Sequence, residues 1–167
     1  MAPRVPVATL VAAALAVAVA VAGCGGGKPP PATPLALSDL VSELVTHRVA
    51  VVKSISGDPG CDSADLAGNG VHLQVRESGD SSIYDVYLLR FKDQATWQRE
   101  ADAVAACAAA GSGTAAAAAD GTLQTIAVSP FRAYGAGWPP ALEQALDAVI
   151  HIAAAGGTNP GAGQPEE

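Results

Sequence analysis

The chain has 167 residues and a formal net charge of −7, with only 4% aromatic residues. This acidic balance argues against nucleic-acid binding, which needs clustered Lys and Arg, and against a domain that lies flat on an anionic membrane. Hydrophobic residues make up 50% of the chain, a fraction raised by an apolar N-terminal run and by alanine runs. The length therefore predicts one small domain with a mostly aliphatic core.

The first residues have the three parts of an export signal. Arg4 supplies a positive charge, residues 5–22 are almost wholly apolar, and small residues come just before Cys24. This order is typical of a secretory signal peptide, here residues 1–23. One alternative is a plain transmembrane anchor, because this apolar run is close to the shortest length that spans a bilayer. Another is an export signal that a cysteine happens to follow.

The tetrapeptide Val21-Ala22-Gly23-Cys24 resembles the lipobox of bacterial lipoproteins, and the resemblance covers residues 1–24 only. It implies that the Cys24 thiol receives a diacylglyceryl group and that the chain is cleaved just before this cysteine. The mature protein would then begin with a palmitate-type lipid anchor at the outer face of the cell membrane. Each buried methylene contributes about 0.8 kcal/mol to membrane binding, so such an anchor needs no transmembrane helix.

The composition divides the rest of the chain into three parts. Residues 24–35 are rich in Gly and Pro and predict a flexible tether. Residues 36–156 form the single predicted domain, and residues 157–167 predict a disordered tail. Loss of Arg4 with the signal peptide leaves eight basic and sixteen acidic residues, a net charge of −8. We interpret this charge as an aid to solubility, with an acidic binding site as the alternative.

Cys61 and Cys107 are the two cysteines that remain once Cys24 is acylated. An even pair of cysteines in an exported domain predicts a disulfide. The chain-entropy cost of a loop of this length gives the bond about 4 kcal/mol of stabilisation at most. Two free buried thiols are the alternative. No His lies at ligand spacing from either cysteine, so we expect no metal site there and no cofactor.

The first half of the domain predicts one helix and three strands. Residues 38–47 have apolar side chains at helical spacing behind Ser38, a typical N-cap residue. Residues 49–55 are rich in β-branched side chains and favour a strand, with a continued helix as the alternative. Residues 71–76 alternate between apolar and polar, and residues 83–91 are apolar on both faces. These two segments predict a hairpin whose second strand is central in the sheet.

The second half predicts two further helices and a short strand. Asp93 is placed to cap a helix over residues 94–109, whose apolar stripe faces the sheet. Residues 111–121 are rich in Ala and Gly without any period, and predict a flexible loop. Residues 123–128 predict a strand. The last helix is predicted to begin at the proline pair 139–140 and to end before a glycine.

Together these elements predict an α+β domain. We expect a small antiparallel sheet of about four strands, packed against two or three helices and held by one disulfide. A strand pair followed by a helix with Trp97 and the late Cys107 is similar to the extracellular sensor-type domains of some bacterial receptor kinases and lipoproteins. That family typically has more cysteines, so the second bridge is absent here, and the resemblance concerns the architecture alone.

Catalytic motifs are missing from the sequence, which has no G-x-S-x-G elbow and no phosphate-binding loop. Asp58 opens a loop with two further acids that lacks the pattern of a calcium loop, so turn formation is its expected role. Asp85 is expected to pair with Arg90 or Arg132 and thereby to satisfy the fold. Three histidines are isolated in sequence and are interpreted as surface residues: His47, His72 and His151.

Phe131, Arg132, Tyr134 and Trp138 are the candidate partner-binding residues. They lie within eight residues, separated by small residues, in a segment that predicts a loop. Aromatic residues and Arg are enriched in binding hot spots. The alternative is that Tyr134 and Trp138 fill the sheet edge and fix the last helix.

The function expected from the sequence is a lipid-anchored module that binds an envelope protein or a small ligand without catalysis. A cell-wall-acting enzyme and a structural spacer without a ligand are the alternatives.

Overall fold

The computed structural model describes residues 35–119 and 121–156, with the side chains of 112–119 excepted. The predicted signal peptide, the predicted lipidation site Cys24, nearly all of the predicted tether and the predicted tail lie outside the described residues. The described elements, in chain order, are α1 (Leu37–Thr46), β1 (Val49–Ser56), α2 (Ala64–Ala67), β2 (Gly70–Glu77), β3 (Tyr84–Arg90), α3 (Gln94–Arg99), α4 (Ala101–Ala119), β4 (Leu123–Val128), β5 (Phe131–Ala136) and α5 (Pro140–Ala154).

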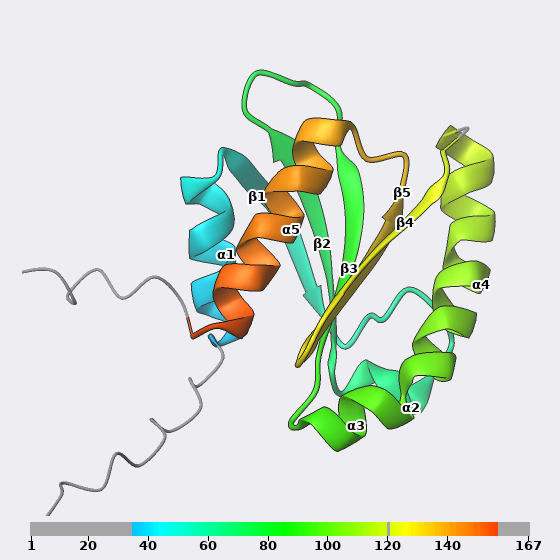
Figure 1. The fold of residues 1–167 in the computed structure, drawn as a ribbon. Coiled ribbons are helices and arrows are strands. Elements are labelled where there is room, and N and C mark those ends of the chain that lie inside the picture. Colours follow the sequence, from blue (N-terminus) through cyan, green and yellow to red (C-terminus); the bar gives the residue numbers. More distant parts are fainter. Residues whose placement is uncertain (1–34, 120, 157–167) are drawn as a thin grey trace, which may run out of the picture. The chain divides into compact units, whose positions relative to one another are not determined.

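The five described strands form one antiparallel sheet in the order β1-β2-β3-β5-β4 (Figure 1). β2 and β3 form the predicted hairpin, and β3 is the central strand, as its apolar faces predict. The register places Lys53 beside Gln74 and Gln74 beside Asp85, so these three residues form one row across β1, β2 and β3. A bulge between Val51 and Lys53 interrupts the edge strand β1.

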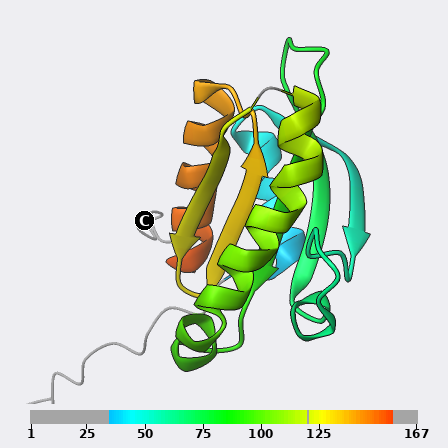
Figure 2. The ribbon, with the colours of Figure 1, turned by 90° about the vertical axis from the view of Figure 1, so that its right-hand side faces the viewer.

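Helices lie on both faces of the sheet. α1 and α5 pack together over one face, and α4 crosses the other face in front of β4 and β5 (Figures 1 and 2). The larger core cluster lies under α1 and α5, and the smaller one lies under α4. The two clusters alternate along β3, because Leu88 belongs to the first and Leu89 to the second. No helix in the described ranges has the length and apolar character to cross a bilayer.

The predicted disulfide is confirmed. Cys61 and Cys107 are bonded with a Cα–Cα distance of 5.3 Å, and the bond ties the loop before β2 to the middle of α4. The α+β class and the antiparallel sheet are confirmed as well. The sheet has five strands rather than about four, and the described part of the chain has five helices rather than two or three.

The segment predicted as a flexible loop over residues 111–121 is helical as far as Ala119, which corrects that prediction. Alanine has the highest helix propensity of all residues, so the run continues the helix once its start is packed on the sheet. Gly111 looks like a helix breaker in the sequence. It is needed there because a Cβ atom would lie 2.7 Å from the carbonyl oxygen of Gly60.

Three further boundaries differ from the sequence prediction. α1 begins at Leu37, with Ala36 at its N-cap, so Ser38 lies inside the helix and is not its cap. The helix predicted over 94–109 consists of α3 and α4, which meet at Glu100. Asp93 does cap α3, with its Oδ1 atom accepting from the Thr96 N–H at 2.7 Å. Residues 49–55 belong to a strand, which settles the alternative of a continued helix.

Candidate functional site

Three of the four candidate partner-binding residues lie in a strand, β5, and Trp138 follows two residues after its end, so the prediction of a loop over the whole segment was wrong. β5 pairs with β3 on one side and with β4 on the other. Phe131, Tyr134 and Trp138 are 0%, 1% and 4% exposed. Side chains this deeply enclosed cannot form an exposed binding surface, and the alternative role in the fold is the one that the structure supports.

Polar groups of Tyr134, Trp138 and Arg132 have partners inside the domain. The Trp138 indole N–H donates to the carbonyl oxygen of Asp85 at 3.0 Å. The Tyr134 hydroxyl donates to the carbonyl oxygen of Pro59. Arg132 is half-buried, with its guanidinium 4.0 Å from the centre of the Trp97 ring and its Nη2 donating to the Trp97 carbonyl oxygen at 3.1 Å. These contacts fasten β5 to its neighbours.

A different cluster, which the sequence did not reveal, joins three titratable side chains. His72 on β2 is 9% exposed, and each of its ring nitrogens faces a carboxylate. Its Nδ1 atom lies 3.1 Å from Asp58 Oδ2, and its Nε2 atom lies 2.7 Å from Asp85 Oδ1. Gln74 Nε2 donates to the same Asp85 oxygen at 3.3 Å. The expectations of a surface His72 and of an Asp85–Arg pair were therefore wrong.

The hydrogen-bond geometry of the cluster restricts which nitrogen and oxygen atoms can carry a proton. A neutral imidazole has one N–H donor and one lone pair, whereas both carboxylates of this cluster need a donor from the ring. Either the imidazolium of His72 donates to Asp58 and to Asp85, or one carboxylate keeps a proton. In both cases the two ring nitrogens are engaged, so His72 in this arrangement has no free nitrogen with which to accept a proton from a substrate.

Neighbouring groups fix this cluster in place. The Asp58 carboxylate also accepts from the Gly60 N–H at 2.9 Å, the turn role expected from the sequence. The Tyr87 ring stacks on His72 with centroids 4.5 Å apart. Burial raises the pKa of Tyr87, and the negative charges of Asp85 and Asp58 raise it further. Tyr134 stacks on Tyr87 in turn, and burial raises its pKa well above the ordinary value.

The other two histidines are surface residues or nearly so. His151 is exposed and lies 3.8 Å from Asp147 one helical turn away. His47 is half-buried at the end of α1, 3.6 Å from Glu43. Pairs of this spacing on a helix contribute little to stability. Among the described residues, no group of three or more His, Cys, Asp or Glu side chains is arranged to bind a metal ion.

Part of the sheet face beside the cluster is open to solvent. α4 packs on β4 and β5, while β1 stands clear of it at the far edge (Figure 2). The row Lys53, Gln74 and Asp85 crosses this part of the face, with Lys53 exposed and the Asp85 side chain 38% exposed. Val52 and Ile83 are 50% and 52% exposed. We call this surface, formed by the outward side chains of β1, β2 and β3, the open half-sheet.

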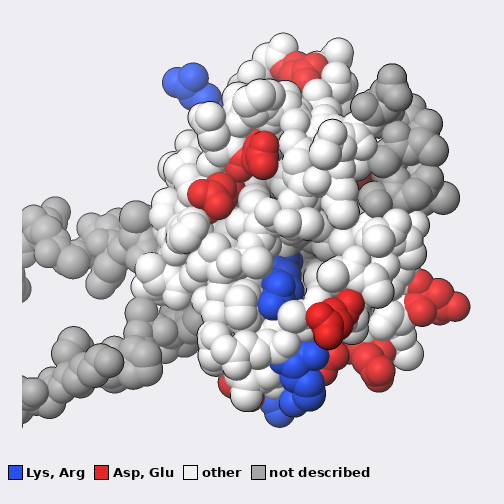
Figure 3. All heavy atoms as spheres, turned by 45° about the vertical axis from the view of Figure 1, so that its right-hand side comes forward, with Lys and Arg blue, Asp and Glu red and all other residues white. Residues whose placement is uncertain are grey.

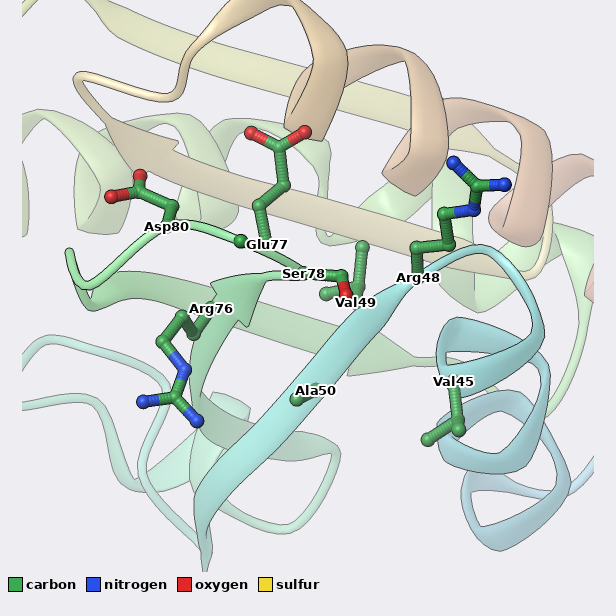
Figure 4. Close-up of a pocket in the computed structure, with 9 residues that line it drawn as sticks. Val45, Arg48, Val49, Ala50, Arg76, Glu77, Ser78 and Asp80 are labelled. Atoms are coloured by element: carbon green, nitrogen blue, oxygen red, sulfur yellow. The ribbon is translucent and has the colours of Figure 1, made fainter.

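A shallow hollow of about 280 Å³ lies at the end of β1 and β2. Arg48, Arg76, Glu77 and Asp80 are among the residues that line it, and Figure 4 shows their charged groups pointing in different directions. Arg48 has a positive φ of 64°, which is uncommon for a residue with a side chain. The carbonyl oxygen of Arg48 accepts from the Ser78 N–H at 2.8 Å. The residue before β1 is thereby hydrogen-bonded to the residue after β2.

No protein family, no curated protein and no solved structure matched the chain. The class that the fold defines is therefore an α+β domain with a helix-covered antiparallel sheet, one disulfide and one open half-sheet.

Proposed function

We propose that this protein is a lipid-anchored extracytoplasmic module that binds an envelope partner through the open half-sheet, without catalysis. The observation that carries the proposal is the row formed by exposed Lys53 and the partly exposed Gln74 and Asp85, on a sheet face whose β4 and β5 are packed against α4. The row offers a cation, an amide and a carboxylate on a backbone that neighbouring strands fix. Exposed Val52 and Ile83 add apolar contact area, a mixture that suits recognition of another protein surface.

The geometry of the cluster behind the row favours binding over catalysis. A general base needs a free acceptor within hydrogen-bond reach of a substrate proton. Both nitrogens of His72 face carboxylates, and one oxygen of Asp85 already contacts His72 and Gln74. These groups position one another, and the exposed part of Asp85 remains available to accept a hydrogen bond from a partner. A cell-wall-acting enzyme, the alternative, would need convergent carboxylates that are free.

The anchor is proposed from the sequence Val21-Ala22-Gly23-Cys24, which lies outside the described residues. We expect the wild-type protein from native membranes to partition into the detergent phase of a cloud-point extraction. Its intact mass should correspond to a chain that begins at an acylated Cys24 and has lost two hydrogen atoms to the oxidation that forms the disulfide. The Cys24→Ser variant should lack the acyl mass and should leave the detergent phase unless its uncleaved apolar segment stays attached.

Mass spectrometry separates these cases, because an uncleaved variant keeps residues 1–23. A wild-type protein that keeps those residues, or that lacks acyl mass after gentle extraction, would contradict the lipid anchor. The proposal for the open half-sheet would then stand or fall on its own experiment.

Binding at the open half-sheet predicts a position-dependent cross-link. We expect a photoreactive phenylalanine derivative in place of Lys53 to give one discrete adduct in intact cells, with at least a fivefold higher yield than the same group in place of Gln144. Gln144 is exposed on α5, over the opposite face of the sheet, and is therefore a matched control. Adduct yields that are equal at both positions, or no adduct from position 53, would contradict binding at this surface.

A further inference from the structure

A second hollow, of about 460 Å³, lies between the start of α1, the loop that follows α2 and the segment after β3. We propose that it binds an oxyanion of the phosphate class through Arg90 and Lys92. This site lies away from the open half-sheet, and the proposal goes beyond the function proposed above. Binding of free phosphate does not depend on that function, whereas binding of a lipid headgroup rests on the proposed anchor.

The charges that line the hollow have one sign. Arg90 and Lys92 are its charged lining residues, and none of the lining residues in the described part of the chain is Asp or Glu. This is unusual in a chain with a net charge of −7. Asp93, which does not line the hollow, lies 4.0 Å from Lys92 in an exposed ion pair, which contributes little. On the face that Figure 3 shows, basic and acidic side chains lie next to one another in the lower half, the end at which α3 lies. A concave site of one sign attracts counter-ions of the other sign.

Arg90 is the main reason to expect a bound anion. It is half-buried, and its Nε atom is enclosed without a hydrogen-bond partner among the described residues. Arg132 also has an enclosed, unpartnered Nε, but its guanidinium lies over Trp97 and donates to a carbonyl oxygen. No such contact is found for the Arg90 guanidinium within the described residues. A partly enclosed guanidinium without compensation is costly. Because Nε itself is enclosed, an oxyanion in the hollow would compensate the charge through the terminal nitrogens of the guanidinium.

The neighbouring backbone keeps the wall of the hollow in place. The Arg90 N–H donates to the Asn69 carbonyl oxygen at 3.0 Å, and the Gly57 N–H donates to the Gly70 carbonyl oxygen at 2.9 Å. Ala36 caps α1 without a side-chain hydrogen bond, so the first N–H groups of that ten-residue helix have no side-chain acceptor there. These donors add to the two cations, since an anion at a helix N-terminus is favoured.

The chemistry of the donors selects the ligand class. A guanidinium can donate two parallel hydrogen bonds to a phosphate or carboxylate, and an ammonium adds a point charge. Phosphate fits the pair better than a carboxylate because it has more acceptor oxygens, and a phosphate monoester also carries a charge of about −1.5 to −2 at neutral pH. The source is either free phosphate or a lipid headgroup. The predicted tether of residues 24–35 spans at most about 43 Å, and the domain begins at Ala36, so an anchored protein can bring the hollow to the headgroups.

The test uses the mature, acylated protein in a non-ionic detergent. We expect inorganic phosphate, titrated at constant ionic strength against chloride, to shift the backbone amide NMR signals of Gly68, Asn69 and Gly70 in a saturable way. Arg90→Gln and Lys92→Gln should each weaken the apparent affinity at least fivefold. Lys53→Gln removes a cation from the open half-sheet and should leave the affinity unchanged.

A second arm distinguishes the two sources. The same protein in lipid nanodiscs without free phosphate should show these shifts with phosphatidylglycerol, and not with detergent alone, if the ligand is a headgroup. Shifts with inorganic phosphate only would assign the site to a free phosphate compound. Lys92 has a side chain that is 78% exposed, so Lys92→Gln remains a folded test even if Arg90→Gln is unstable. No saturable shift in either arm, or equal affinities in wild type and Lys92→Gln, would overturn the proposal.

Discussion

Replacing Trp138 with alanine is expected to lower the free energy of unfolding by about 3–5 kcal/mol, the usual range for loss of a buried indole. Trp138 is 4% exposed and belongs to the larger core cluster. The indole packs so closely on β5 that a Cβ atom added at Gly135 would lie 2.5 Å from its Nε1 atom. Urea denaturation followed by far-ultraviolet circular dichroism would measure the change.

Trp138→Phe is the matched control, because it keeps an aromatic ring and removes the N–H that donates to the Asp85 carbonyl oxygen. We expect this variant to lose about 1–2 kcal/mol, as for one buried hydrogen bond. A Trp138→Ala protein with wild-type stability would contradict the buried position of the ring. It would also return Trp138 to the candidate surface residues that the sequence suggested.

The elements that the sequence predicted well are those whose burial has one clear period. β2 alternates in sequence between apolar and polar residues, and α5 repeats its apolar residues at helical spacing, with buried Leu142, Leu146, Val149 and Ile150. In such segments a single neighbouring layer determines the pattern. The bond between Cys61 and Cys107 could be predicted from their even number in a chain whose sequence predicts export.

The segments that the sequence misjudged are those fixed by contacts across the fold. β5 is buried on both faces at consecutive positions, with Ala133, Tyr134 and Gly135 all enclosed, so it has no alternation to detect. Gly135 in β5 and Gly111 in α4 suggested loops, yet each is a place where another part of the chain approaches too closely for a Cβ atom. Nothing in the local sequence distinguishes a glycine of this kind from a glycine in a turn.

The His72 cluster could not be predicted from the sequence for the same reason, because its residues are brought together by contacts across the fold. The predicted hairpin already brings β2 and β3 together, and its exact register would have placed Gln74 opposite Asp85, next to His72. The sequence does not provide that register, because the turn of the hairpin has several residues. Asp58 reaches His72 through a loop whose path depends on the disulfide at Cys61, and this path could not be worked out from spacing.

Removing the disulfide with Cys61→Ser and Cys107→Ser together is expected to lower the free energy of unfolding by about 4 kcal/mol, from the chain entropy of a 46-residue separation. The bond also fixes the loop that supplies two contacts to the sheet. The Pro59 carbonyl oxygen in this loop accepts from Tyr134, and Asp58 contacts His72. Urea denaturation of the double variant and of the oxidised wild-type protein would measure the difference.

The imidazole nitrogens of His72 distinguish local loosening of this loop from a general loss of stability. The variant Asp58→Asn removes the Asp58 carboxylate and keeps the disulfide. If the disulfide positions Asp58, the nitrogen NMR shifts of His72 in the folded double cysteine variant should move toward the shifts measured in Asp58→Asn. The contact with Asp85, made between two strands of one hairpin, should persist in both variants. If the His72 shifts of the double cysteine variant are identical to those of the oxidised wild type, strand pairing alone places Asp58. If the urea unfolding midpoint is also unchanged, the disulfide does not stabilise the fold.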